Sequence, residues 1–370
     1  MCTLINYFSG STINGIVEIT VNKPTNVRSI ALVISGEAKV DWSEDEGMGD
    51  DKKSVTYSAN ENYINTTTVL YGSTDGNTVS ISPGYHTYKF LCTLPPELPS
   101  SIEGRDGKIR YSAKVVFDRP WKFNKTFNTG YTVIKITDLN YENPQIRLPS
   151  TLEIQKKFWC CCFASRPLIV EATIPKSGYV SGEYISVNFK VFNTSGKRIQ
   201  RFSVSLKQLI NSKSDYPSSK SKLQTITLTK QVIGSIENSQ RDVFQSSLLI
   251  PPVPPTCNEI TCRIVQVNYE VHVKVHVNGP HIAPVVKLPL IIGNIPLTSI
   301  NKNSKQEPLS TNSLLQNPKT PEISAEEFGF PPPSYEEANY VEKVNMNANE
   351  QHPIAESTYL PRYPVFNFNQ

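Results

Sequence analysis

The chain has 370 residues, 38% of them hydrophobic, with 28 prolines and a formal net charge of +4 at pH 7. This length suits two ordinary domains and a tail, and the proline content argues against an all-helical protein. Residues 298–370 carry five Lys/Arg and nine Asp/Glu, a net charge of −4, which leaves +8 for residues 1–297. Such a mildly basic body suits an acidic membrane surface or acidic peptides. Its charge is too weak and too scattered to indicate nucleic-acid binding.

The N-terminal segment MCTLINYFSG has no basic leader and no apolar run of signal-peptide length. No stretch of the sequence approaches the roughly 18 consecutive apolar residues that a membrane-spanning helix requires. The seven cysteines are an odd number and three of them are adjacent, which does not suit a disulfide framework. We therefore expect a cytoplasmic protein.

Residues 1–145 are predicted to form a first β-sandwich. In KIRYSAKVVF (108–117), the apolar side chains mostly alternate with polar ones, which is typical of an antiparallel strand with one buried face. Turn signals such as Asp75-Gly76 and Asp106-Gly107 separate runs of this kind. Many short strands joined by polar turns are typical of a sandwich.

The polar face of the same strand carries a basic stripe, formed by Lys108, Arg110 and Lys114. One interpretation is a contact for acidic or phosphorylated cargo or for lipid. The other is the ordinary solvated face of a sheet.

Residues 146–164 are predicted to connect the two domains. This segment contains FWCCCFA (158–164), flanked by basic residues. One hypothesis is S-acylation of Cys160, Cys161 and Cys162, which would anchor the protein peripherally to a membrane. The alternative is a buried strand, because free cysteine behaves as a small apolar residue.

Residues 165–297 are predicted to form a second β-sandwich. Apolar residues alternate strictly with others in EYISVNFKV (183–191) and NYEVHVKVHV (268–277). The segment IPPVPPTCNEITCRIVQVNY (250–269) echoes LPPELPSSIEGRDGKIRY (94–111): each is a proline-broken stretch followed by a strand that carries a tyrosine. A duplicated sandwich explains this echo.

Cys257, Cys262, His272 and His276 have a spacing that resembles a zinc finger. In a finger the two histidines lie on a helix, where residues four apart are neighbours. Here they lie in a predicted strand, which separates them by about 13 Å. We therefore expect no metal and no cofactor.

Residues 298–370 are rich in Asn, Ser, Pro and Glu and show no sustained periodicity, so we expect a disordered tail. Within it, Pro332, Pro333 and Tyr335 form a PPxY motif, the ligand of WW domains. Consecutive prolines favour polyproline II, and a tyrosine three residues after the first proline lies on the same edge of that helix. The sequence therefore predicts a WW-domain-binding site.

A second, weaker candidate lies 28 residues downstream, at Leu360, Pro361 and Tyr363. It keeps one proline and the tyrosine of the motif. Two such sites on one tail could engage two WW domains of one partner and gain avidity.

The motifs together make the chain resemble the α-arrestins, the arrestin domain-containing proteins. The segments that carry the resemblance are GEAKVDW (36–42), LPSSIEG (98–104), DRPW (118–121), GYVSGEYISV (178–187), VNYEVHV (267–273), LPLIIGNIPL (288–297) and the PPxY tail. The resemblance implies two tandem arrestin-like, immunoglobulin-like β-sandwiches in an all-β protein.

The resemblance also implies an adaptor. Its arrestin-like domains would bind a membrane receptor or transporter as cargo, and its tail would recruit a WW-domain HECT-type ubiquitin ligase. Ubiquitination would then promote endocytosis and endosomal sorting, so the protein would be recruited from the cytoplasm to the plasma membrane and endosomes. The alternative is a trafficking scaffold on endosomes that acts without a ligase. The sequence holds no phosphate loop, nucleophile elbow or paired-carboxylate pattern, so we do not expect an enzyme.

Overall fold

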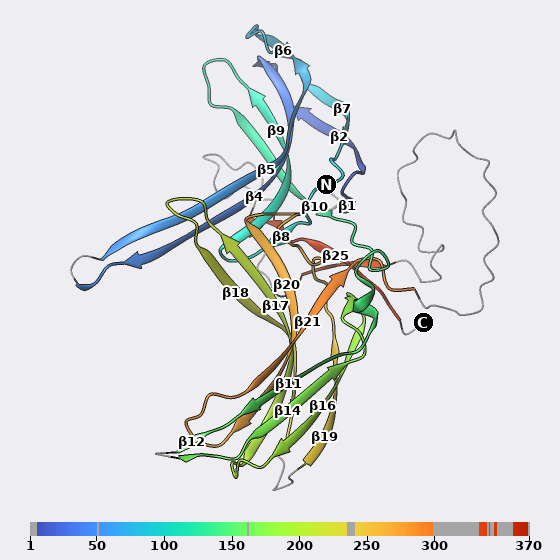
Figure 1. Cartoon of the computed structure of the whole chain (residues 1–370). Coiled ribbons are helices and arrows are strands. Elements are labelled where there is room, and N and C mark those ends of the chain that lie inside the picture. Colours follow the sequence, from blue (N-terminus) through green and yellow to red (C-terminus); the bar gives the residue numbers. More distant parts are fainter. Residues whose placement is uncertain are drawn as a thin grey trace, which may run out of the picture.

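The computed structural model describes residues 6–49, 52–160, 163–234, 241–298, 333–338, 340, 344–345 and 358–368. These residues form an all-β molecule with two sandwiches, one above the other in Figure 1, and a 3-10 turn, η2 (Pro144–Arg147), at their join. No helix in the described ranges has the length and apolar character to cross a membrane. The prediction of two tandem β-sandwiches is confirmed.

Within the described residues, the first sandwich contains ten strands. They are β1 (Asn6–Phe8), β2 (Thr12–Val21), β3 (Thr25–Val27), β4 (Ser29–Glu46), β5 (Lys53–Gly72), β6 (Val79–Ile81), β7 (Gly84–Thr93), β8 (Ile102–Glu103), β9 (Gly107–Asp118) and β10 (Lys125–Ile134). One sheet has the order β1-β10-β9-β4-β5, with β8 beside β9, and the pairs β2–β7 and β3–β6 are separate from it. The β4–β5 hairpin extends far beyond the sandwich (Figure 1).

The second sandwich has two larger sheets and a small hairpin. One sheet has the order β11 (Ser150–Lys156), β14 (Leu168–Ile174), β16 (Tyr184–Asn193) and β19 (Arg241–Leu249). The other has the order β15 (Gly178–Val180), β21 (Val285–Gly293), β20 (Val265–Val277), β17 (Ile199–Lys213) and β18 (Ser221–Ile233). The hairpin pairs β12 (Trp159–Cys160) with β13 (Phe163–Ala164).

The two sandwiches repeat one topology. The order β1-β10-β9-β4-β5 corresponds to β15-β21-β20-β17-β18, and in both sheets the first pair is parallel while the other pairs are antiparallel. The echoed tyrosines make the same contact: Tyr111 on β9 donates to the Pro99 carbonyl at 2.7 Å, and Tyr269 on β20 donates to the Pro254 carbonyl at 2.6 Å. These equivalences support the interpretation of a duplicated sandwich.

The predicted alternation places apolar side chains in the core. On β16, Ile185, Val187 and Phe189 are buried and the intervening Asn188 is exposed. On β20, Val271, Val273 and Val275 are likewise buried. Burial of these side chains is the main stabilising contribution to such a fold.

The expected connection at residues 146–164 contains a strand of the second sandwich. β11 pairs with β14 over seven residues, from Ser150 opposite Ile174 to Lys156 opposite Leu168. β11 lies at the edge of its sheet, and Leu152 is exposed there. The segment therefore lacks the strong apolar alternation by which the inner strands were predicted.

The tail differs from a fully disordered segment at two places. Ser334–Glu337 forms β22, which pairs antiparallel with β25 (Arg362–Val365), and β23 (Val344–Asn345) pairs with β24 (Thr358–Tyr359). The segment YLPRYPVF (359–366) is rich in apolar and aromatic residues, and a composition averaged over the whole tail conceals it. Residues 299–332 lie outside the described part of the chain.

Candidate functional site

The PPxY motif is partly described. Pro332 lies outside the described residues, Pro333 precedes β22, and Tyr335 belongs to β22. Tyr335 lies opposite Pro364 of β25, and Glu336 lies opposite Tyr363. Tyr335 is half-buried, and this burial raises the pKa of its hydroxyl above the ordinary value. The tyrosine predicted to bind a WW domain is thus engaged in a strand pair.

The second candidate motif is buried. Leu360 is 5% exposed and Tyr363 is 1% exposed, and Pro361 between them is also buried. The Tyr363 hydroxyl donates to the Ser101 carbonyl at 2.8 Å. In this conformation a WW domain cannot reach these side chains. The cause is a set of long-range contacts, because aromatic residues of the tail find hydrogen-bond partners and apolar neighbours on the body.

Residues 358–366, here called the docking segment, lie across both sandwiches. The Arg362 amide donates to Thr132 Oγ1 on β10 at 3.1 Å, and the Phe366 amide donates to the Ser181 carbonyl, just after β15, at 3.0 Å. The side chain of Phe366 packs in a small apolar cluster that also contains Leu139, Ile146 and Val180. The docking segment therefore contacts the first sandwich, the join and the second sandwich.

Two glycines leave room for the docking segment. A Cβ atom at Gly130 on β10 would lie 2.7 Å from Cγ of Tyr359, closer than real Cβ contacts. A Cβ atom at Gly182 would clash with the carbonyl of Phe366, and Gly182 has a φ of +94°, which favours glycine in any case. The surface of the body is shaped to accept this segment.

The residues that follow β22 also contact the docking segment and the body. The Ala338 amide donates to the Pro361 carbonyl at 3.2 Å, and Ala338 is fully buried. Tyr340 packs against the main hydrophobic core. The PPxY strand and the docking segment are thus one unit that rests on the body.

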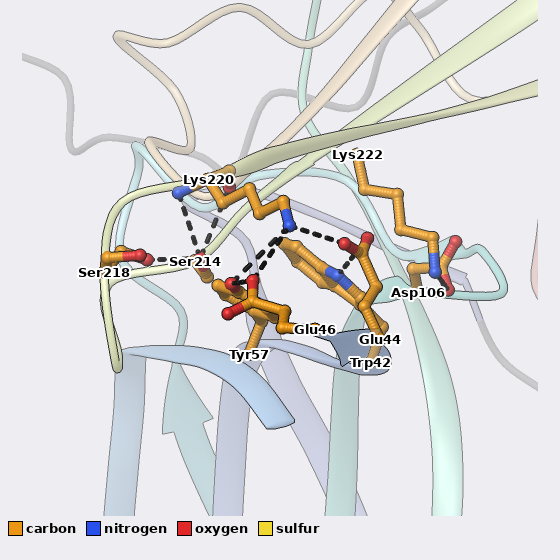
Figure 2. A network of polar contacts seen from close by, with 9 residues as sticks. All are labelled: Trp42, Glu44, Glu46, Tyr57, Asp106, Ser214, Ser218, Lys220 and Lys222. Atoms are coloured by element: carbon orange, nitrogen blue, oxygen red, sulfur yellow. Dashed lines mark hydrogen bonds and ion pairs between the residues drawn. The ribbon is translucent and has the colours of Figure 1, made fainter. Parts of the chain in front are cut away.

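A polar network joins the two sandwiches at the ends of long hairpins (Figure 2). Lys220, which precedes β18, forms ion pairs with Glu44 and Glu46 of β4, and its ammonium lies 4.5 Å from the centre of the Tyr57 ring on β5. The hydrogen bond from Lys220 lowers the pKa of Glu44, and the bond from Tyr57 lowers that of Glu46. These contacts tie the first sandwich to the second.

Further contacts join the two sandwiches beside this network. Lys222 of β18 forms an ion pair with Asp106 at 3.1 Å. The amides of Asp215 and Tyr216 both donate to the Ser58 carbonyl at 3.0 Å, and the Ser58 amide donates back to Tyr216 at 2.8 Å. We call this set of ion pairs and backbone bonds the hairpin clamp.

The predicted basic stripe does not present three unopposed cations. Arg110 makes two bonds to the carboxylate of Glu103, at 2.6 and 2.8 Å, and Glu103 is buried. Burial lowers the pKa of Lys108. Lys114 lies further along β9. A contact of these residues with acidic cargo or lipid stays a prediction.

The cysteines considered above as an acylation site or as metal ligands form two groups. Cys160 ends β12 beside Trp159, which is 72% exposed, whereas Cys161 and Cys162 lie outside the described residues. Cys257 and Cys262 are buried free thiols. The two histidines of the zinc-like spacing have their own partners, His272 with Glu270 and His276 with Ser203.

Sequence reasoning missed the part of the site that belongs to the body. Ser101, Thr132, Gly130 and Gly182 give no signal of their own, because each is a small residue in an ordinary strand or turn. The cluster of four apolar side chains in the tail was the available signal: Tyr359, Leu360, Tyr363 and Phe366.

These features define a class: tandem β-sandwich proteins that hold an extended peptide on their surface. Residues 5–140 match the family model described as "Arrestin (or S-antigen), N-terminal domain", and residues 164–297 match "Arrestin (or S-antigen), C-terminal domain". The chain belongs to the arrestin domain-containing proteins, the α-arrestins. This membership indicates an adaptor role in protein trafficking.

Three relatives illustrate the match. The chain is 30% identical to "Arrestin domain-containing protein 17" of Caenorhabditis elegans over 313 residues, covering 81% of this chain and 70% of that protein. It is 26% identical to "Arrestin domain-containing protein 4" of Mus musculus, covering 80% and 71%. It is 25% identical to "Arrestin domain-containing protein 4" of Homo sapiens, covering 97% and 81%.

Proposed function

We propose that this protein is an adaptor that binds membrane cargo through its arrestin-like sandwiches and recruits a WW-domain HECT-type ubiquitin ligase through Pro332, Pro333 and Tyr335. Ubiquitination of the cargo then promotes its endocytosis and endosomal sorting, at the plasma membrane and on endosomes. The observation that carries the proposal is a PPxY motif joined to an arrestin-type body. Two prolines restrict the motif toward polyproline II, so less conformational entropy is lost when a WW domain binds.

Replacing Tyr335 by alanine is expected to abolish binding of an isolated WW domain to the full-length protein. The tyrosine fills a pocket of the WW domain, and small interfaces of this kind have affinities of roughly micromolar. Titration calorimetry would measure the loss, and cargo ubiquitination in cells should fall with it. Tyr141→Ala is the matched control, because Tyr141 is 91% exposed and lies in the body.

The alternative, an endosomal scaffold that sorts cargo without a ligase, makes the opposite prediction. Tyr335→Ala would then leave cargo ubiquitination and sorting at the wild-type level, with the protein folded and expressed normally. That result would overturn the ligase adaptor.

Peripheral membrane association is a further part of the proposal. It combines S-acylation of Cys160, Cys161 and Cys162 with the basic stripe at Lys108, Arg110 and Lys114. The exposed Trp159 beside the cysteines suits the membrane interface. Replacing the three cysteines by serine is expected to remove an acyl-exchange signal and to shift the protein from the membrane fraction to the supernatant. An unchanged membrane fraction would argue against the anchor.

A further inference from the structure

The tail of this protein lies in an extended conformation on the body and buries three aromatic side chains there. They are Tyr359, Tyr363 and Phe366, each buried at a different place on the body. Tyr359 lies over Gly130, Tyr363 reaches the Ser101 carbonyl, and Phe366 enters the apolar cluster at the join.

We propose that the body carries a binding site for an extended aromatic peptide, that the docking segment fills it in cis, and that this docking withholds Tyr335 from WW domains. The regulatory half of the inference rests on the proposed function, because it concerns access to the same PPxY motif. The site itself is a property of the body and can be tested without a WW domain.

The chemistry of the site favours tyrosine in the middle of the peptide. Tyr363 is almost completely buried, and burial raises the pKa of its hydroxyl well above the ordinary value. Its only described hydrogen bond is the one to the Ser101 carbonyl. A buried hydroxyl and a buried carbonyl satisfy one another in this way, whereas phenylalanine would leave the carbonyl without a partner.

The backbone of the peptide is recognised independently of its side chains. The Arg362 amide bonds to Thr132 Oγ1, and the Phe366 amide bonds to the Ser181 carbonyl. These bonds fix an extended conformation whose two ends lie on different sandwiches. The ligand class is therefore an extended peptide with tyrosines four residues apart and a phenylalanine three residues further on.

Docking and WW binding exclude one another. A WW domain binds the PPxY motif as polyproline II with its tyrosine in a pocket of the domain. In the docked tail Tyr335 instead lies in an antiparallel pair, opposite Pro364, and is half-buried. The pair must separate before a WW domain can surround Tyr335. The apparent affinity for the WW domain is then reduced by the fraction of molecules with an open tail.

The experiment compares WW-domain binding by two variants that are expected to release the docking segment. One substitution is in the docking segment and the other is in the body. Tyr363→Ala removes the central side chain of the docking segment. Gly130→Ala changes only the body: the three nearest atoms to its new Cβ all belong to Tyr359. Gly234→Ala is the matched control, because a Cβ there has no atom within 4 Å. A synthetic peptide of residues 326–342, which has the motif but no docking segment, serves as the open reference.

We expect both opening variants to bind an isolated WW domain about tenfold more tightly than the wild type, close to the affinity of the synthetic peptide. Gly234→Ala should match the wild type. Hydrogen exchange provides the second readout: the amides of Arg362 and Phe366 should be protected in the wild type and lose that protection in Gly130→Ala. This readout does not depend on any WW interaction.

The outcomes distinguish the proposed ligase-adaptor function from the proposed peptide site on the body. If the synthetic peptide fails to bind the WW domain, the proposed function fails, while the exchange data still judge the peptide site. If the peptide and all full-length variants bind equally, the withholding of Tyr335 is wrong and the ligase adaptor stands. Weaker binding by Tyr363→Ala would mean that Tyr363 is itself a WW contact, and this result would overturn the inference. Unprotected amides in the wild type would overturn the peptide site.

Discussion

Replacing Tyr269 by phenylalanine is expected to lower the free energy of unfolding of the second sandwich by about 3 kcal/mol, since two buried polar partners lose their bond. The Tyr269 hydroxyl donates to the Pro254 carbonyl and accepts from Nε2 of Gln208 at 3.0 Å. The ring is 1% exposed, so water cannot replace the hydroxyl. The aromatic ring itself remains, which confines the effect to hydrogen bonding.

The equivalent substitution in the first sandwich should cost less. Tyr111→Phe removes one described bond, to the Pro99 carbonyl, and we expect a loss of about 1–2 kcal/mol. Chemical denaturation of the full-length protein would measure both variants. Tyr141→Phe, at an exposed position, should stay within about 0.5 kcal/mol of the wild type. Equal effects at Tyr269 and Tyr111 would show that the bond from Gln208 contributes nothing.

Reversing the charge of Lys220 is expected to open the hairpin clamp. Lys220→Glu would place a third carboxylate beside Glu44 and Glu46, where the ammonium now satisfies both. Like charges at this separation repel, and the repulsion weakens as salt is added. The β4–β5 hairpin should therefore separate from the loop before β18.

Backbone amides report this opening directly. The Ser58 and Tyr216 amides bond across the clamp, and in Lys220→Glu we expect them to exchange about tenfold faster, because local opening exposes them to water. The double variant with Glu44→Lys should recover part of the protection. Lys190→Glu is the control, since Lys190 pairs with Glu171 inside the second sandwich at 2.8 Å. Unchanged exchange in Lys220→Glu would show that the backbone bonds hold the clamp without the ion pairs.

The inner strands of both sandwiches could be predicted from the sequence because one physical cause determines them. Where one face of a strand is buried, every second residue must be apolar, and the run Ile185, Val187, Phe189 on β16 shows this pattern. The echo of the two proline-broken segments also predicted a real equivalence, since Tyr111 and Tyr269 make the same bond.

The remaining features depend on long-range contacts that a local pattern does not contain. β11 is an edge strand with little apolar alternation, so it looked like a connection. The clamp pairs Lys220 with Glu44, residues whose proximity follows from the arrangement of two domains. The docking segment was not recognised because the composition of the whole tail is polar. Tyr359 and Tyr363 are nevertheless the kind of residues that become buried in folded proteins.

Because the docking segment is part of the same chain as its site, its effective concentration there is on the order of 1 mM, the range typical of tethered ligands. A free peptide that makes the same contacts must reach a comparable concentration before it displaces the segment. Dilute peptides of similar pattern are therefore poor competitors. Peptides of this pattern gathered on one surface can supply the required concentration, so the proposed site would respond to the local density of its competitor.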